Sequence, residues 1–413
     1  MARFLAYLRG LDPQFSRAVW TLEIGTLVNF FGSGIAYPFL LIYLHNVRGF
    51  GLGTAGLVAA AIGAVGVVAG PVTGPVIDRL GGRKTVSASL VVSAVGYALL
   101  PLVEHPLQAF GVAFLLGLGT GIFWPSTTSL LVGLSPPEKR HTAFALQRVA
   151  VNTGFGLGGL AGGLVATTAN PTSFTVLFAI DAATYVAMLA VMPFVPEPVV
   201  EDELDEHAHA GYARVLRDGV FTSLVGLNVL FVAAGYAPLE LLPVFAKNHN
   251  GVSERWIGLI FFCNTAALVL AQLPVARFVE GRRRLRALAV MPAGFAVCWL
   301  AVLAGGAWLD RTAAALVFVG AAAAFGLSTS FHGPTQGALV ADLAPARLRG
   351  RYMALSAMSW EIGYVIGPAV GGFVLASAPL ALWPLCAAIC AASIGGVLAV
   401  ERRLPVELRL TPG

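Results

Sequence analysis

The chain has 413 residues, of which 57% are hydrophobic and only 11% are charged, and its formal net charge is +5. A soluble domain carries roughly 45–50% apolar and about 25% charged residues, so a soluble core of this length could not hide so much apolar surface. The basic residues stand in short loops between apolar segments, not on one face with interleaved aromatics. This pattern argues against a nucleic-acid partner and indicates topology signals.

Twelve segments are long and apolar enough for a membrane-crossing helix, which needs about 20 residues. The alternating pattern of transmembrane strands is absent from the sequence. The sequence therefore predicts an all-α membrane protein with twelve transmembrane helices in two pseudo-symmetric six-helix bundles. The segments lie near residues 18–44, 52–77, 85–103, 107–131, 142–168, 172–195, 219–246, 256–276, 285–306, 312–341, 351–376 and 379–401.

One long polar stretch, PEPVVEDELDEHAHAG, begins at Pro196 and precedes Asp218. It predicts a linker at 196–218 between an N-terminal bundle (1–195) and a C-terminal bundle (219–413). His207 and His209 within it could hold a metal, but a solvated linker is the better interpretation. We predict no metal site and no cofactor.

The loop charges predict the orientation. With a cytoplasmic N-terminus and alternating helices, only four loop basic residues fall outside, namely Arg48, Lys247, Arg255 and Arg311. Basic residues concentrate in cytoplasmic loops of membrane proteins, so we expect both termini and the linker in the cytoplasm. The bias toward Arg, Ala and Gly is typical of a GC-rich bacterial genome, which suggests the bacterial inner membrane.

The two halves contain matching segments that run in the same direction. At an offset of 209, residues 125–165 and 334–374 share Pro125/Pro334, Arg140/Arg349, Gly154/Gly363, Gly158/Gly367, Gly162/Gly371 and Gly163/Gly372. At an offset of 199, Asn29/Asn228 and Tyr37/Tyr236 coincide. Parallel repeats of this kind surround an axis along the membrane normal and hold substrate near the midplane.

The segment GPVIDRLGGRKT follows the second expected helix and resembles the motif between helices 2 and 3 of the major facilitator superfamily. The match rests on Gly74, Asp78, Arg79, Gly82, Arg83 and Lys84. Asp78 stands at a helix C-terminus, where its charge opposes the helix dipole and needs a positive partner. The resemblance implies that this partner is the start of helix 11 and that the contact acts as a gate. A loop that only sets topology is the alternative.

A second resemblance lies in the glycine-rich helices 5 and 11. GYVIGPAVGG, which starts at Gly363, fits the pattern GxxxGPxxGG that antiporters of the superfamily usually carry in helix 5. Here helix 5 has GFGLGGLAGG, with Gly159 where proline is expected. Small residues permit close helix packing. The predicted packing residues are Gly154, Gly158, Gly162, Gly163, Gly363, Gly367, Pro368, Gly371 and Gly372.

Ionisable residues inside a membrane are costly and usually functional. The proton-coupling candidates are Glu361, Glu23, Asp181, Glu240 and His332. Glu361, roughly 15 Å into its helix, is the strongest candidate. Asp181 and His332 could instead be structural hydrogen-bonding groups, and Glu240 could be interfacial. Glu23 lies at a depth similar to that of Arg148, so these two could pair.

Further side chains are candidates for the substrate cavity, although polar groups also hold helices together. They are Asn29, Trp124, Gln147, Arg148, Asn152, Phe331, Gln336 and Trp360. Intramembrane acids outnumber intramembrane bases, and aromatics flank the expected cavity. Such a pocket suits lipophilic cations through charge attraction and cation–π contact.

The sequence lacks GxxxxGK[ST], HExxH and GxSxG, so it predicts no enzyme. Its resemblance to the superfamily covers essentially the whole chain and is closest to bacterial twelve-helix drug/proton antiporters. This implies a monomeric secondary transporter that exports lipophilic or cationic drugs against protons by alternating access. The alternative is a proton-coupled carrier of a sugar, a peptide or another small metabolite.

Overall fold

The computed structural model describes residues 15–198, 212–345 and 348–411. Eleven helical stretches among them are long and apolar enough to cross a membrane. The twelfth expected span is α7 (Arg140–Val165), whose 26 residues reach roughly 39 Å but include many glycines. The all-α, twelve-helix prediction is confirmed. His207, His209 and most of the predicted linker lie outside the described residues.

The first half begins with α2 (Arg17–Ala36), which continues through η1 (Tyr37–Phe39), α3 (Leu40–Ile42) and η2 (Tyr43–Val47). It goes on with α4 (Leu52–Leu80), α5 (Gly82–Leu99), α6 (Pro106–Leu134), α7 and α8 (Thr172–Val191).

The second half begins with α9 (Tyr212–Leu216), α10 (Gly219–Leu230), η6 (Phe231–Tyr236) and α11 (Pro238–Asn250). It continues with α12 (Glu254–Val279), α13 (Arg284–Leu288), α14 (Val290–Trp308) and α15 (Arg311–Thr329). It ends with η7 (Gly333–Gly337), α16 (Ala338–Leu343), α17 (Arg349–Ser377) and α18 (Leu382–Arg403).

Several helix ends differ from the sequence prediction. Helix α4 runs on to Leu80, through Pro71 and Pro75, and ends where Gly81 adopts a φ of 85° that disfavours other residues. The expected span 312–341 forms one membrane-crossing stretch, Arg311–Val340, whose hydrogen-bond pattern widens at the π-helical η7, where Pro334 cannot donate a backbone hydrogen bond. The length of an apolar segment shows where a helix crosses the hydrocarbon layer. The helix itself can continue beyond that layer into the polar headgroup zone, so its ends differ from those of the apolar segment.

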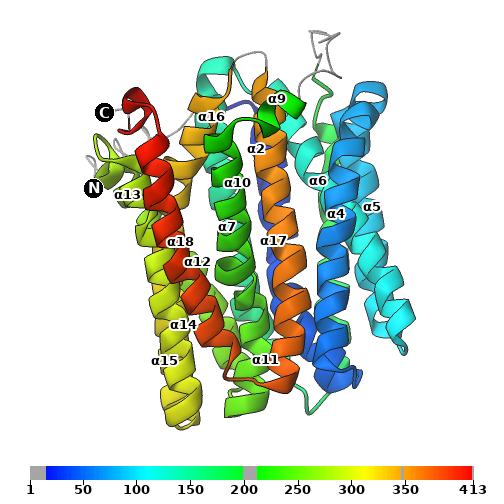
Figure 1. The fold of residues 1–413 in the computed structure, drawn as a ribbon. Helices are drawn as coiled ribbons and strands as arrows, with labels where there is room; N and C mark the ends of the chain where they lie inside the picture. Colours follow the sequence, from blue (N-terminus) through cyan, green and yellow to red (C-terminus); the bar gives the residue numbers. More distant parts are fainter. Residues whose placement is uncertain (1–14, 199–211, 346–347, 412–413) are drawn as a thin grey trace, which may run out of the picture.

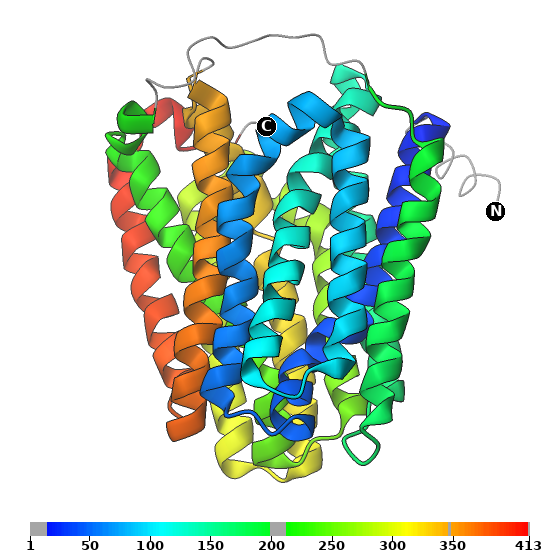
Figure 2. The same ribbon diagram turned by 90° about the vertical axis from the view of Figure 1, so that its right-hand side faces the viewer.

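The helices form two bundles that lie side by side (Figures 1 and 2). In the first, α2 packs on α7 and α8, and α6 packs on α4 and α5; in the second, α12 packs on α15, and α14 on α15 and α18. The bundles meet where α4 contacts α17 and where α7 contacts α12. The described chain begins and finishes at one end of the molecule, the upper end in Figure 1, which we call the terminal end.

Glycines bring the helices of each half into backbone contact. A Cβ atom at Gly158 of α7 would lie 2.0 Å from the carbonyl oxygen of Phe31 on α2. In the second half, a Cβ atom at Gly367 of α17 would lie 2.2 Å from the Cβ of Ala237. The repeated glycines Gly158 and Gly367 therefore both allow close contact with a neighbouring helix of their own bundle, as expected for small-residue packing in membranes.

The last glycine of each repeat joins the two bundles instead. A Cβ atom at Gly163 would lie 2.8 Å from the Cα of Gly258 on α12, and one at Gly372 would lie 3.1 Å from the Cα of Gly56 on α4. The Pro368 carbonyl oxygen would lie 2.3 Å from a Cβ atom at Gly56. In each half, one glycine-rich helix, α7 or α17, thus packs both within its own bundle and against the other bundle.

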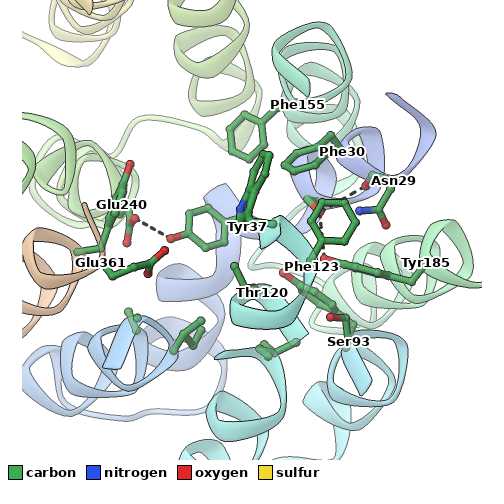
Figure 3. A pocket seen from close by; sticks show the side chains of 18 residues that line it. Asn29, Phe30, Tyr37, Ser93, Thr120, Phe123, Phe155, Tyr185, Glu240 and Glu361 are labelled. Carbon is green, nitrogen blue, oxygen red and sulfur yellow. Dashed lines mark hydrogen bonds between the residues drawn. The ribbon is translucent and has the colours of Figure 1, made fainter. Parts of the chain in front are cut away.

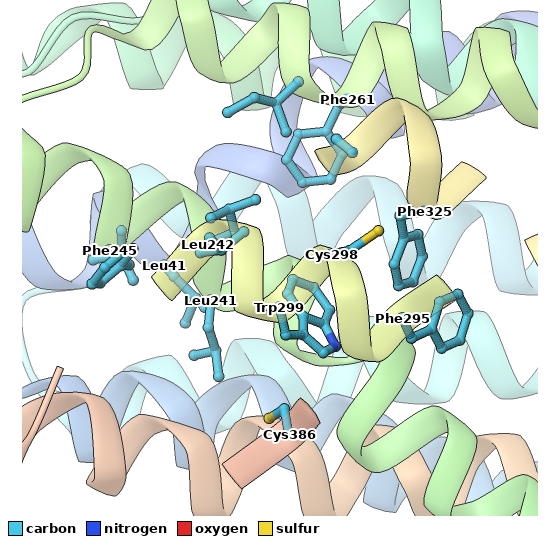
Figure 4. Close-up of a cluster of buried hydrophobic side chains, with 14 of the residues drawn as sticks. Leu41, Leu241, Leu242, Phe245, Phe261, Phe295, Cys298, Trp299, Phe325 and Cys386 are labelled. Carbon is cyan, nitrogen blue, oxygen red and sulfur yellow. The ribbon is translucent and has the colours of Figure 1, made fainter. Parts of the chain in front are cut away.

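Aromatic side chains fill the core of the second half (Figure 4). Phe295 and Phe325 stack with ring centroids 4.2 Å apart, and the Trp299 indole N–H donates to the Ala234 carbonyl at 2.9 Å. Cys298 and Cys386 are buried as free thiols in the same core. This packing fixes α14 against η6 and α18.

We expect Gly158→Ala to destabilise the protein by about 1–3 kcal/mol, because the added methyl group must push α7 away from the α2 backbone. The measurement is the thermal unfolding midpoint in detergent. Gly320→Ala is the matched control, since a Cβ atom there meets nothing within 4 Å. Equal midpoints for the two variants would contradict the packing role.

Candidate functional site

A central cavity of about 360 Å³ lies between the two bundles (Figure 3). The first half supplies most of its wall, from α2, α4, α5, α6, α7 and α8, and the second half contributes from α11 and α17. Its lining residues are Asn29, Phe30, Ser33, Tyr37, Ala59, Ile62, Gly63, Ser93, Tyr97, Leu116, Thr120, Phe123, Trp124, Phe155, Tyr185, Glu240, Glu361 and Tyr364.

Helix α2 and the first residue of η1 present one continuous face to this cavity. Asn29, Ser33 and Tyr37 follow one another at four-residue spacing, which places them on the same side of a helix. Ser33 and Tyr185 lie within hydrogen-bonding distance, with their hydroxyl oxygens 3.4 Å apart. Asn29 is a predicted cavity residue, whereas Ser33 and Tyr37 are not among the predicted ones, although their four-residue spacing from Asn29 is visible in the sequence.

More tyrosines were missed on other helices. The Tyr97 ring of α5 stacks on the Tyr185 ring of α8 with centroids 5.6 Å apart. Tyr364 joins the wall from α17, one turn beyond Glu361. No local pattern distinguishes these side chains from other membrane tyrosines, so only the folded structure identifies them as cavity residues.

Two carboxyl groups face the cavity from the second half. Glu240 on α11 accepts a hydrogen bond from the Tyr37 hydroxyl at 2.6 Å, which links the two bundles (Figure 3). Glu240 is therefore not merely interfacial. Glu361 on α17 is half-buried, and within the described residues its carboxylate has no hydrogen-bond or ion-pair partner.

Aromatic rings cover the first-half side of the cavity. Trp124 lies against Phe30 with centroids 5.5 Å apart and against Phe123 at 5.6 Å. Phe155 packs edge-on against Tyr37 at 6.3 Å. Apolar ring faces thus oppose the two carboxyl groups across the cavity.

The bundles close over the cavity at the end opposite the terminal end. The Asn46 side-chain amide donates to the Asn248 side-chain oxygen at 2.6 Å. Toward the terminal end the seam between α4 and α17 parts: a Cβ atom at Gly70 or Gly74 would meet nothing within 4 Å. In Figure 1, α4 and α17 lie farther apart at the upper, terminal end than at the lower end.

The predicted gating motif lies on the parted side. Asp78 is exposed and, among the described residues, makes no hydrogen bond or ion pair. Gly82 begins α5, and the backbone N–H of Arg83 donates to both carboxylate oxygens of Glu197, at 3.2 and 3.1 Å. An anion at a helix N-terminus is stabilised by the helix dipole, so Glu197 holds the turn in place. Arg79 and Lys84 flank this turn at the terminal end.

Three other proton candidates lie outside the cavity wall. Glu23 is buried, and neither of its carboxylate oxygens has a hydrogen-bond partner within the described chain. Arg148 is exposed and its guanidinium lies against Gly333, so the suggested Glu23–Arg148 ion pair is wrong. Asp181 is fully buried at the α2–α8 contact and lies 3.4 Å from the Thr184 hydroxyl.

His332, the third of these candidates, makes a buried structural network. Its Nε2 lies 2.9 Å from the side-chain oxygen of Asn228, whose amide donates to the Ser359 hydroxyl at 2.7 Å. The His332 ring also packs on Trp360 at 5.1 Å. This arrangement matches the alternative in which His332 is a structural hydrogen-bonding group.

The remaining predicted cavity residues do not belong to the lining. Trp360 packs on Tyr236, with centroids 4.9 Å apart. The Gln336 amide donates to the Leu224 carbonyl at 3.2 Å, and the Asn152 amide donates to the Arg148 carbonyl at 2.8 Å. Phe331 and Gln147 are buried in helix contacts. Trp360 and Gln336 contact η6 and α10, and α17 presents Glu361 and Tyr364 to the cavity instead.

Comparisons with known proteins agree with this architecture. The sequence model of the Major Facilitator Superfamily matches residues 22–253 and 229–411. Two helical bundles around a central cavity, together with this match, are the arrangement of a membrane carrier. The chain belongs to the Major Facilitator Superfamily.

Two relatives show the range of similarity. The uncharacterized MFS-type transporter YttB of Bacillus subtilis is 25% identical over 363 residues, covering 87% of this chain and 88% of the relative. The multidrug resistance protein MdtH of Klebsiella pneumoniae is 26% identical over 329 residues, covering 79% and 77%.

Solved structures share the fold. The nucleoside transporter NupG superposes with a TM-score of 0.70 at 16% identity, over 93% of this chain and 99% of that chain. The peptide transporter POT in complex with sulfate superposes with a TM-score of 0.75 at 17% identity, over 96% of each chain.

Paired cysteines test the closed and parted ends of the seam between the bundles. We expect Asn46→Cys/Asn248→Cys to be joined efficiently by a short bifunctional thiol reagent, because the native side chains touch. Gly70→Cys/Met353→Cys, on α4 and α17 at the terminal end, should be joined poorly. Peptide mass spectrometry measures both yields, and single-cysteine variants control for links between molecules. The reverse order of yields would contradict this conformation.

Proposed function

We propose that this carrier exports lipophilic cations, such as dyes or drugs, in exchange for protons. The observation that carries the proposal is the cavity itself. Glu240 and Glu361 face aromatic rings across it, and none of the described residues that line it is basic. Negative charge beside exposed π-faces attracts organic cations in a partly dehydrated site. The similarity to MdtH, which is named a multidrug resistance protein, supports the same class.

Glu361 is the proposed site of exchange between proton and substrate. Its carboxyl group lines the cavity without a partner among the described residues, so it is available to a proton or to a cation. Glu240 already accepts the Tyr37 hydrogen bond that ties the bundles together at the closed side. A change at Glu240 would therefore act on closure as well as on binding.

The proposed transport cycle is alternating access by rocking of bundles 1–195 and 219–413 around the cavity. The described conformation, closed at the Asn46–Asn248 contact and parted near Gly74, would be the inward-facing one. In the outward-facing state, the parted ends of α4 and α17 would meet, and Asp78 would reach the start of α17. A single chain contains the whole cavity, which supports a monomeric carrier.

A proton-coupled carrier of a polar metabolite is the second candidate. The hydroxyl groups of Ser33, Ser93, Tyr97 and Tyr185 offer hydrogen bonds on the first-half wall. Polar solutes need many such paired groups. The fold neighbours NupG and POT, named as nucleoside and peptide transporters, are compatible with this candidate.

Cells that overexpress the protein should accumulate less ethidium than control cells, and collapse of the proton gradient should erase the difference. Glu361→Gln should abolish transport driven by a pH gradient in proteoliposomes yet retain substrate counterflow, because a neutral amide cannot exchange a proton. Fluorescence of intravesicular ethidium measures both.

The control is Glu280→Gln, which removes an exposed acid at the terminal end and should leave flux unchanged. Surviving pH-driven flux in Glu361→Gln would move the proton site to another acid. Unchanged accumulation of several unrelated cations, together with flux of a neutral or anionic metabolite, would favour the second candidate.

Orientation has its own test, at the two ends of α12. Arg255 and Glu280 are both exposed, and the helix between them spans the bundle. We expect Arg255→Cys to react with a membrane-impermeant maleimide in intact cells, and Glu280→Cys to react only after permeabilisation. Gel-shift labelling reads out both, and labelling of position 280 in intact cells would reverse the proposed orientation.

A further inference from the structure

A second pocket, of about 440 Å³, lies at the terminal end, away from the central cavity. It is formed by α13, the last turns of α18 and the segment after α18. Its lining residues are Arg283, Arg286, Leu398, Glu401, Arg402 and Arg409. Four guanidinium groups therefore share a pocket with one carboxylate.

The single acid does not balance this charge. Glu401, with only 6% of its side chain exposed, is paired with Arg283 at 2.6 Å and with Arg286 at 3.4 Å. Arg409 donates to the backbone carbonyls of Leu404 and Arg402, which carry no net charge. The pocket keeps a positive excess that an anion would neutralise.

Backbone contacts hold the pocket in shape. The Arg284 N–H donates to the Arg409 carbonyl at 2.9 Å, and the Thr411 hydroxyl accepts from the Arg282 N–H at 3.2 Å. Arg284 also pairs with Asp342 on α16 at 2.6 Å. The segment after α18 is thus fastened beneath the loop that carries Arg283.

The matching place in the first half lacks the excess. Glu197 comes shortly after α8, much as Glu401 stands in the last turn of α18. Glu197 is paired with one arginine, Arg83, at 3.9 Å. Topology signalling needs basic residues in the loops but does not require them to converge on one pocket. Topology signalling alone therefore does not account for four arginines that line one pocket in the second half.

One apolar side chain, Leu398 on α18, lines the pocket and is 38% exposed. The segment that carries Arg409 has two more exposed apolar side chains, Leu410 at 53% and Val406 at 70%. Helix α18 is long and apolar enough to cross a membrane, and Arg402 stands in its last turn, so the pocket lies at the end of a spanning helix, where lipid headgroups are found. Arginine binds phosphate through charge-assisted, often bidentate hydrogen bonds.

We propose that this pocket, between α13, α18 and the segment after α18, binds the phosphate headgroup of an anionic phospholipid. The guanidinium groups hold the phosphate, and Leu398, Val406 and Leu410 contact the start of the acyl chains. Occupancy stabilises the terminal end of the second half, since the same segment is fastened to α16 through Arg284.

The test is a native mass spectrometry titration of the whole protein in a neutral detergent with phosphatidylglycerol. Each basic residue near a headgroup contributes about fivefold in affinity. Arg402→Gln should therefore weaken binding about fivefold, and Arg283→Gln/Arg402→Gln roughly 25-fold. Within the described chain the Arg402 guanidinium makes no ion pair, so its single variant is expected to fold even if the double variant does not.

Arg214→Gln/Arg217→Gln is the matched control, because it removes two charges at the same end of the molecule outside the pocket. Its affinity for phosphatidylglycerol should equal that of the native protein. Equal loss in this control, or no loss in Arg402→Gln, would overturn the site.

Two further titrations identify the source of the phosphate. Phosphatidylcholine, with the same acyl chains, should bind much more weakly than phosphatidylglycerol. Inorganic phosphate at millimolar concentration should not displace the lipid. Equal binding of the two lipids, or displacement by inorganic phosphate, would overturn the assignment to an anionic lipid.

Discussion

Close backbone contact between helices at glycine positions is the constraint on which the rest of this structure depends. In a bilayer, no hydrophobic gain brings helices together, so van der Waals contact must do so. Gly154, Gly158 and Gly162 let α7 lie on α2, while Gly163 and Gly372 let the two bundles touch. These contacts fix which faces of α2, α7 and α17 remain for the cavity.

The same constraint separates two kinds of intramembrane acid. Asp181 lies where α2 and α8 meet at Gly32, and the Asp181 side-chain oxygen would be 2.7 Å from a Cβ atom there, so it belongs to helix packing. Glu240 and Glu361 lie on the cavity wall between the bundles, where Glu240 also accepts the Tyr37 hydrogen bond that links them. Burial makes every such charge costly, but only these two of the intramembrane acids in the described chain line the cavity.

The two halves share a fold but differ in chemistry. The first half supplies most of the rings and hydroxyl groups of the cavity, whereas the second supplies both of its carboxyl groups and the Tyr364 side chain. At the terminal end, Glu197 fixes one arginine in the first half, and Glu401 lies among four in the second. Repeats related by an axis along the membrane normal can keep a common scaffold while each copy acquires its own role.

The class of the molecule follows from features that can be read along the chain. Apolar length predicted all twelve helices, and the repeated glycines predicted the tight packing that the helices show. Of the residues proposed from the sequence, Asn29, Trp124, Glu240 and Glu361 line the central cavity. These features are local: span length, spacing along one helix and charge at a given depth.

The side of each helix that meets a given neighbour became apparent from the folded structure alone. Gln336 and Trp360 are as polar or aromatic as the lining residues, yet they face α10 and η6. Glu23 and Arg148 share a depth, but one is buried and the other exposed, so they do not pair. A helix fixes spacing along its axis, but its rotation is set by the helices packed around it, which the sequence of one segment does not encode.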